Sequence, residues 1–167
     1  MSPPLRKPRP QRTSRLPELI GSFAGRTVLL VGDLVADQFV FGEIRRVSRE
    51  APVLILKHRQ TWVVPGGGAN AACNLAELGA RVLPVGVVGD DPEGRALREC
   101  FRQRAIDTRG ILVAPGVPTV TKSRFLAGTV HGPRQQVLRL DREPPEPASE
   151  SRRASIASSS DGKYAFV

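Results

Sequence analysis

Pro65-Gly66-Gly67-Gly68-Ala69-Asn70 separates two apolar, strand-like segments and opens a short helix that closes at Gly79. Consecutive glycines allow a positive φ or a close approach of the main chain to a ligand, and the start of a helix presents unpaired N–H groups. Such a turn predicts a small-molecule site. Taken without its neighbours, the glycine triplet fits a flexible surface turn equally well.

The segments around this turn alternate between strand and helix patterns. The first is an unbroken apolar run before Gly32-Asp33, as expected for a strand buried on both faces of a parallel sheet. Strand, helix, strand, helix, strand with short connections predicts a parallel α/β sheet that binds ligands at the carboxyl ends of its strands. The segments are, in order, 28–31, 69–78, 82–88, a helix beginning at Asp91-Pro92-Glu93, and 110–113.

Two stretches carry a period-two pattern instead, residues 38–64 and 118–141. Both predict half-exposed antiparallel hairpin strands. The first stretch lies between the first strand and the glycine turn, so we expect it to cover the same end of the parallel sheet as the ligand site. The sequence therefore predicts an α/β fold with a small antiparallel β lid.

Five blocks along the chain carry a resemblance to a known family. They are Val31-Gly32-Asp33-Leu34-Val35-Ala36-Asp37, Arg46-Val47-Ser48-Arg49-Glu50-Ala51-Pro52, Gly66-Gly67-Gly68-Ala69-Asn70-Ala71-Ala72, Thr119-Val120-Thr121-Lys122-Ser123-Arg124 and Gln135-Gln136-Val137-Leu138-Arg139-Leu140-Asp141. Together they resemble the PfkB-type (ribokinase-like) carbohydrate kinases, and within them the bacterial heptose phosphate kinases of ADP-heptose synthesis. The resemblance implies a ribokinase-like parallel sheet with helices on both faces, of which residues 23–143 would form the N-terminal half.

The resemblance also implies phosphoryl transfer from ATP to a sugar hydroxyl, and it suggests which residues hold the sugar. Asp37, with Asp33 as a second candidate, would accept hydrogen bonds from sugar hydroxyls. Main chain at Gly66, Gly67 and Gly68 would approach the sugar ring, and the amide of Asn70 would bond to neighbouring hydroxyls. Lys122 and Arg124 would share one face of a strand and reach a phosphate on the substrate.

Residue type alone allows a plainer interpretation of each candidate. The two aspartates could be strand-end turn residues, Asn70 a helix cap, and the Lys122 and Arg124 pair a solvated strand face. Gln38 and Arg49 depart from the family pattern, which commonly has Arg and Pro at these positions.

The 167 residues contain no Asp-Thr-x-Gly-Ala-Gly-Asp segment, which in this family carries the catalytic base and the anion hole. ATP and Mg²⁺ are implied as cofactors, but their binding segments are absent from this stretch. We therefore assign no catalytic residue and expect a sugar phosphate as the substrate, bound by a chain that is inactive alone. A truncated, a frameshifted and a split gene product all fit the sequence.

Both ends of the chain have biased composition. Residues 1–22 are basic and Pro-rich and supply much of the net charge of +9, so we expect a disordered arm; residues 144–167 predict a disordered or truncated tail. The arm suggests an alternative, nucleic-acid binding, which is disfavoured because no aromatic residue is interleaved with its cations. A dinucleotide-binding protein is disfavoured because no GxGxxG turn follows the first strand.

The remaining composition points to a chain of the cytoplasm. Two cysteines are too few for a disulfide framework, and no stretch of about 20 apolar residues could span a membrane. The two histidines do not suggest a metal site. Because half of a sheet leaves an unpaired edge, we expect a homo-oligomer formed through that edge or through the lid.

Overall fold

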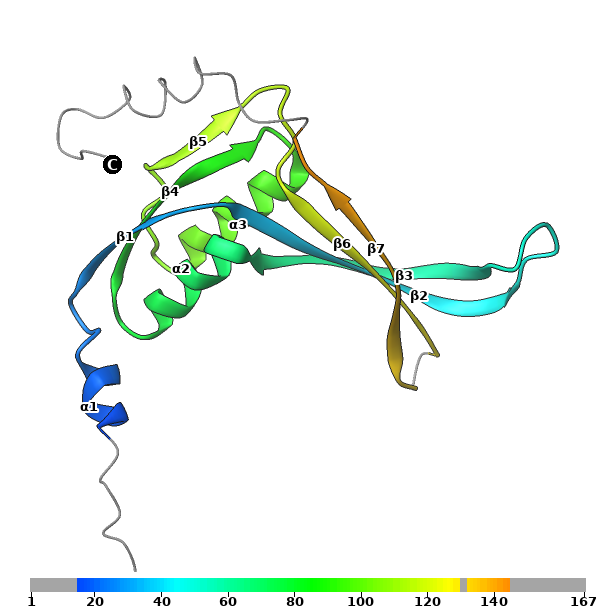
Figure 1. Cartoon of the computed structure of the whole chain (residues 1–167), viewed down its shortest axis with the longest axis horizontal. Coiled ribbons are helices and arrows are strands. Elements are labelled where there is room, and N and C mark those ends of the chain that lie inside the picture. The colour runs from blue at the N-terminus through cyan, green and yellow to red at the C-terminus, as the bar shows by residue number, and fades with distance from the viewer. Residues whose placement is uncertain (1–14, 130–131, 145–167) are drawn as a thin grey trace, which may run out of the picture.

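The computed structural model describes residues 15–129 and 132–144, which form a body and a lid (Figure 1). The elements are α1 (Leu16–Gly21), β1 (Thr27–Val31), β2 (Leu34–Val47), β3 (Leu54–Gly66), α2 (Gly67–Glu77), β4 (Arg81–Gly89), α3 (Pro92–Gln103), β5 (Ile111–Ala114), β6 (Thr121–Gly128) and β7 (Arg134–Arg142).

The body is a three-stranded sheet in the order β1-β4-β5, and all of its strands are parallel. Its two crossovers, through α2 and α3, step across the sheet in the same direction. Because such crossovers are right-handed, both helices pack on the same face of the sheet. There they bury a core in which Val82 and Val88 of β4 meet Ala72 of α2 and Leu97 and Phe101 of α3.

The opposite face of this sheet is uncovered in the described residues. Side chains that alternate with the core positions point to it: Leu29 is 42% exposed and Val31 62% exposed on β1, and Val87 is 36% exposed on β4. The expectation that the first strand is buried on both faces is therefore wrong for this chain. Its apolar pattern is that of a fully buried strand, but both described crossover helices lie on one side.

The lid is a four-stranded sheet in the order β3-β2-β6-β7. As expected, β2 with β3 and β6 with β7 are antiparallel hairpins. The hairpins join through a parallel pairing of β2 with β6, so the sheet is mixed. Only Gly32 and Asp33 separate β1 from β2, so the long β2 and β3 strands leave the body directly at the carboxyl end of β1 (Figure 1).

The expected boundaries need two corrections. Residues 16–21 form α1 within the range expected to be disordered, because the Pro at its start and Glu18 in its first turn favour a helix, although α1 buries no side chain. The lid begins at Leu34 and not at 38, since β2 starts at once after the turn. The rest of the predicted arm, residues 1–14, and the tail from 145 onward lie outside the described residues.

Among the described helices, none has the length and apolar character needed to cross a membrane.

Candidate functional site

The glycine turn lies against the end of β1. Gly66 is the N-cap of α2, and Gly67 has a φ of +52°, which only glycine adopts readily. The N–H of Gly68 donates to the backbone carbonyl of Asp33 at 2.9 Å. A Cβ on Gly68 would come within 2.9 Å of the same oxygen, so this close contact requires a glycine. The predicted juxtaposition of Asp33 with the glycine turn is therefore present, through main chain.

Asp37 lies beside this turn from the lid side. An added Cβ on Gly66 would lie 2.8 Å from Oδ2 of Asp37, so the carboxylate occupies the space that the missing side chain leaves open. Arg124 of β6 donates to Oδ1 of Asp37 at 2.9 Å, and both side chains are only partly exposed. The carboxylate therefore links the glycine turn, β2 and β6.

One face of the lid carries the other polar candidates. Asp37 pairs with Lys122 and Phe39 with Arg124 in the parallel β2–β6 register, so these four side chains share a face. This is the common face predicted for Lys122 and Arg124. The position of Arg124 differs from the expectation of a free phosphate contact, because its guanidinium pairs with Asp37 in the structure.

An aromatic pair completes this face of the lid. Phe39 and Trp62 stack with their ring centroids 5.3 Å apart, and the Arg124 guanidinium lies 5.9 Å from the centroid of the Phe39 ring. Phe39 was not among the site residues predicted from the sequence. The signal was present, since Phe39 stands two residues after Asp37 and alternation places both on one face.

Asn70 stands on the exposed side of the first turn of α2. The N-cap is Gly66, so the plainer interpretation of Asn70 as the capping residue does not hold. Its amide is open to solvent beside the glycine turn, as a ligand contact requires.

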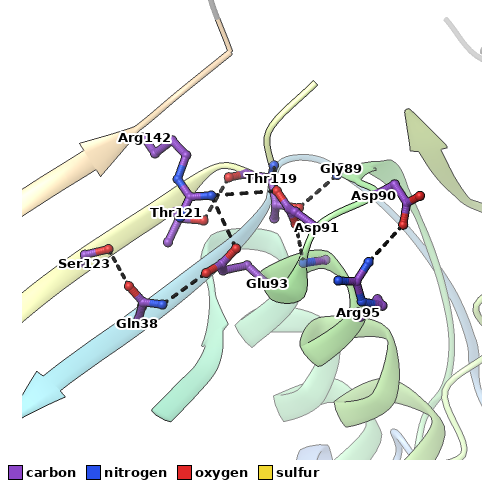
Figure 2. Close-up of polar contacts among 11 residues, drawn as sticks. Gln38, Gly89, Asp90, Asp91, Glu93, Arg95, Thr119, Thr121, Ser123 and Arg142 are labelled. Atoms are coloured by element: carbon purple, nitrogen blue, oxygen red, sulfur yellow. Dashed lines mark hydrogen bonds and ion pairs between the residues drawn. The ribbon is translucent and has the colours of Figure 1, made fainter. Parts of the chain in front are cut away.

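A second polar cluster surrounds the start of α3, on the face of the lid opposite Asp37 and Arg124 (Figure 2). Asp91 caps α3 by accepting from the N–H of Gly94 at 2.8 Å, as its place before Pro92 predicted. It also accepts from Thr119, at 2.8 Å from the N–H and 2.6 Å from the hydroxyl. Burial alone would raise the pKa of Asp91, but these hydrogen bonds and the charge of Arg142 hold that pKa below its ordinary value.

Neither cluster resembles a metal centre. Within residues 15–129 and 132–144, no group of three or more His, Cys, Asp or Glu side chains could hold a metal ion. The described side chains thus offer no metal cage built from protein ligands alone, and we derive no step through Mg²⁺.

The pattern of the pfkB family of carbohydrate kinases matches residues 27–138, which include the glycine turn, Asp37 and Arg124. The chain belongs to this family. That assignment confirms the resemblance found in the sequence, and the glycine turn lies within the matched residues of this pfkB family chain.

Relatives with curated names agree with the family. The chain is 42% identical over 139 residues to the bifunctional protein HldE of Hyphomonas neptunium, covering 83% of this chain and 28% of that protein. It is also 42% identical over 124 residues to HldE of Magnetococcus marinus, covering 74% of this chain and 24% of that protein. The pfkB family chain thus spans about a quarter of the length of these relatives.

Solved structures confirm the ribokinase-like fold. Ribokinase of Arabidopsis thaliana, solved in complex with ribose and ATP, matches with a TM-score of 0.52 and 20% identity. The match covers 80% of this chain and 42% of that chain. At this identity the likeness establishes the arrangement of strands and helices.

Proposed function

We propose that this chain forms the sugar-phosphate-binding half of a heptose phosphate kinase, and that the group bound between the glycine turn and the lid is a heptose phosphate. The observation that carries the proposal is the convergence of Asp37, Gly66 and Arg124 where β2 leaves the body. The HldE relatives support the choice of sugar, since they align with the chain at 42% identity through this region.

The chemistry of this convergence suits a polyhydroxylated ligand. A carboxylate accepts several hydrogen bonds, and a main chain without side chains lets a sugar ring come close. Oδ2 of Asp37, which lies beside Gly66, would accept a hydrogen bond from a sugar hydroxyl. Asn70, exposed at the start of α2, can donate and accept at a neighbouring hydroxyl.

Lys122 and Arg124 supply the positive charge for the phosphate that the substrate already bears. Lys122 lies on the same lid face as Arg124 and pairs with Asp37 in the strand register. A phosphate that approaches this face would exchange part of the Asp37–Arg124 interaction for contacts with both cations, because charge-assisted hydrogen bonds to phosphate are strong.

Phosphoryl transfer itself requires groups that these residues do not supply. Transfer to a sugar hydroxyl needs a base to position the nucleophile and positive charge around the transferred phosphoryl group. ATP is the donor that the proposal implies, with Mg²⁺ as its counterion. We propose that the chain alone binds the sugar phosphate without turning it over, and that activity requires the Gly-Ala-Gly-Asp segment of a complete kinase.

Titration calorimetry of the full chain with a heptose phosphate, and with the same heptose lacking phosphate, tests the proposal. We expect Asp37→Ala and Asn70→Ala to weaken binding of both ligands by about 1–3 kcal/mol each. Lys122→Ala should weaken binding of the phosphorylated sugar alone. The matched control is Arg59→Ala, which breaks an ion pair with Glu43 elsewhere in the lid and should leave both affinities unchanged.

The proposed site would be refuted if the unaltered chain did not bind the heptose phosphate. It would also be refuted if the Asp37→Ala and Asn70→Ala variants bound it as tightly as the unaltered chain. Adding ATP and Mg²⁺ to the chain should yield no phosphorylated product. Product would show that the chain needs no further segment.

A further inference from the structure

We propose that Glu93 is a positioning residue that braces the lid onto the body and thereby holds Asp37 and Arg124 over the glycine turn. This inference concerns the site of the proposed function and rests on it for the ligand. The brace is defined as Glu93, Gln38, Ser123 and Arg142 (Figure 2). None of these residues belongs to the candidate sugar site.

The brace joins three lid strands to one helix end. Nε2 of Gln38, on β2, donates to Oε1 of Glu93 at 3.1 Å. Nη1 of Arg142, on β7, donates to Oε2 of the same carboxylate at 3.3 Å. Ser123, on β6, donates its hydroxyl to Oε1 of Gln38 at 2.9 Å. Each oxygen of the Glu93 carboxylate is therefore bound to a different strand of the lid.

The body side of the brace is itself firmly held. Glu93 lies in the first turn of α3, which is capped by Asp91. Asp91 accepts two hydrogen bonds from Thr119, whose hydroxyl in turn accepts from the N–H of Gly89 at the end of β4 at 2.9 Å. Arg142 also lies 3.9 Å from Asp91. The carboxylate that meets the lid thus stands on a helix end anchored to the parallel sheet.

The brace and the site lie on opposite faces of the same strands. Successive residues of a strand point to opposite faces, and three neighbouring pairs follow this rule: Asp37 and Gln38, Ser123 and Arg124, and Asp141 and Arg142. One member of each pair faces the site side and the other faces α3. Any rotation of the lid that broke the brace would therefore move Asp37 and Arg124 with it.

Burial makes this arrangement specific. Glu93 is 7% exposed and Ser123 is 6% exposed, so water cannot replace the lost partners easily. A buried carboxylate without its partners is strongly unfavourable, whereas a fully bonded network selects one geometry. The observed register of β2 with β6 places Gln38 opposite Ser123, and there Gln38 bonds to Glu93 and Ser123 together. The network thus favours a single angle between lid and body.

Hydrogen exchange of the full chain, read by mass spectrometry, tests whether the brace holds the lid. Glu93→Gln keeps the shape and the acceptor for Gln38 but removes the charge that Arg142 contacts. We expect about tenfold faster amide exchange in β6 and β7, with β4 and α2 unchanged. Arg142→Leu should give the same change, and the double variant should add little to it. Arg142→Lys, which keeps the charge, should retain most of the amide protection that Arg142→Leu loses.

The matched control is Asp90→Asn. Asp90 pairs with Arg95 at the same end of α3, at 3.0 Å, but the pair is exposed and does not reach the lid (Figure 2). We expect this variant to exchange as the unaltered chain does. Unchanged lid exchange in Glu93→Gln, or an equal increase in Asp90→Asn, would overturn the brace.

Affinity for a heptose phosphate, measured by calorimetry on the same variants, tests the positioning role. We expect Glu93→Gln to bind the heptose phosphate about tenfold more weakly than the unaltered chain. Asp90→Asn should bind it normally, and Arg142→Lys should keep most of the affinity of the unaltered chain. A loosened lid with undiminished affinity would overturn the positioning role. If the unaltered chain binds no heptose phosphate, the proposed function fails, and the exchange comparison still decides whether Glu93 braces the lid.

Discussion

Arg124 and Asp37, 87 residues apart in sequence, form an ion pair of 2.9 Å that joins β6 to β2. Their side chains are 24% and 22% exposed, so the pair is partly shielded from solvent. We expect a double-mutant cycle of Asp37→Asn and Arg124→Gln, read by urea unfolding, to give a coupling free energy of about 1 kcal/mol. Strict additivity would mean that the two charges do not stabilise the lid.

Gly66 offers a steric test of the site. A Cβ there would lie 2.8 Å from Oδ2 and 2.9 Å from Cγ of Asp37, so Gly66→Ala should displace the carboxylate and abolish measurable binding of a heptose phosphate. The backbone itself allows alanine, because φ at Gly66 is −125°. Gly32→Ala is the control, since nothing lies within 4 Å of its added Cβ. Calorimetry should show normal binding for the control; a normal Gly66→Ala would mean that Asp37 need not stay in place.

The two cysteines should differ in reactivity. Burial, and then the neighbouring Cys100, raise the pKa of the Cys73 thiol to about 11, so almost no Cys73 thiolate exists near neutral pH. Cys100 is half-buried on α3. We expect a disulfide-forming thiol reagent to modify Cys100 alone in the folded chain, and both thiols in denaturant. Rapid modification of a folded Cys100→Ser variant would contradict the burial of Cys73.

Asp91 should make stability depend on pH in the acid range. Although burial opposes it, hydrogen bonding lowers the pKa of Asp91 in the folded state, so its contribution is full above the unfolded-state pKa of about 3.9. The contribution is lost as pH falls through the lowered folded-state pKa. Urea midpoints between about pH 6 and about pH 2 should fall less steeply for Asp91→Asn, which caps the helix without titrating. An equal fall would assign the acid sensitivity to other carboxylates.

The uncovered face of the parallel sheet should make the isolated chain associate. Leu29 and Val31 expose 42% and 62% of their surface on β1, and exposed apolar patches of this kind favour association. We expect sedimentation velocity to show oligomers of the chain. Val31→Lys should shift these oligomers toward monomer, and so should addition of the C-terminal half of a pfkB family kinase in trans. Leu138→Lys, at a lid position 56% exposed, distinguishes association through the lid. A clean monomer with a cooperative melt would contradict both routes.

Local patterns predicted much of this fold. The apolar periods of β4 and α3, the capping sequence at Asp91 and the hairpin patterns of the lid each depend on residues within a few positions of one another, so they can be recognised in the sequence. The candidate site was predicted in part for the same reason. The glycine triplet predicts a close approach of the main chain to a neighbouring group, and the spacing of Lys122 and Arg124 predicts that they share one face of a strand.

Residues close together in the chain encode the order of strands and helices, the glycine turn and the family motifs, so these features can be recognised in the sequence. Long-range packing brings Arg124 to Asp37 and brings Gln38 and Arg142 to Glu93. It also leaves one face of the parallel sheet uncovered by the described residues. These outcomes depend on which strands become neighbours and on the side to which each crossover turns. Contacts between residues 49 to 87 positions apart carry no local signature, since only strand order and register bring their side chains together.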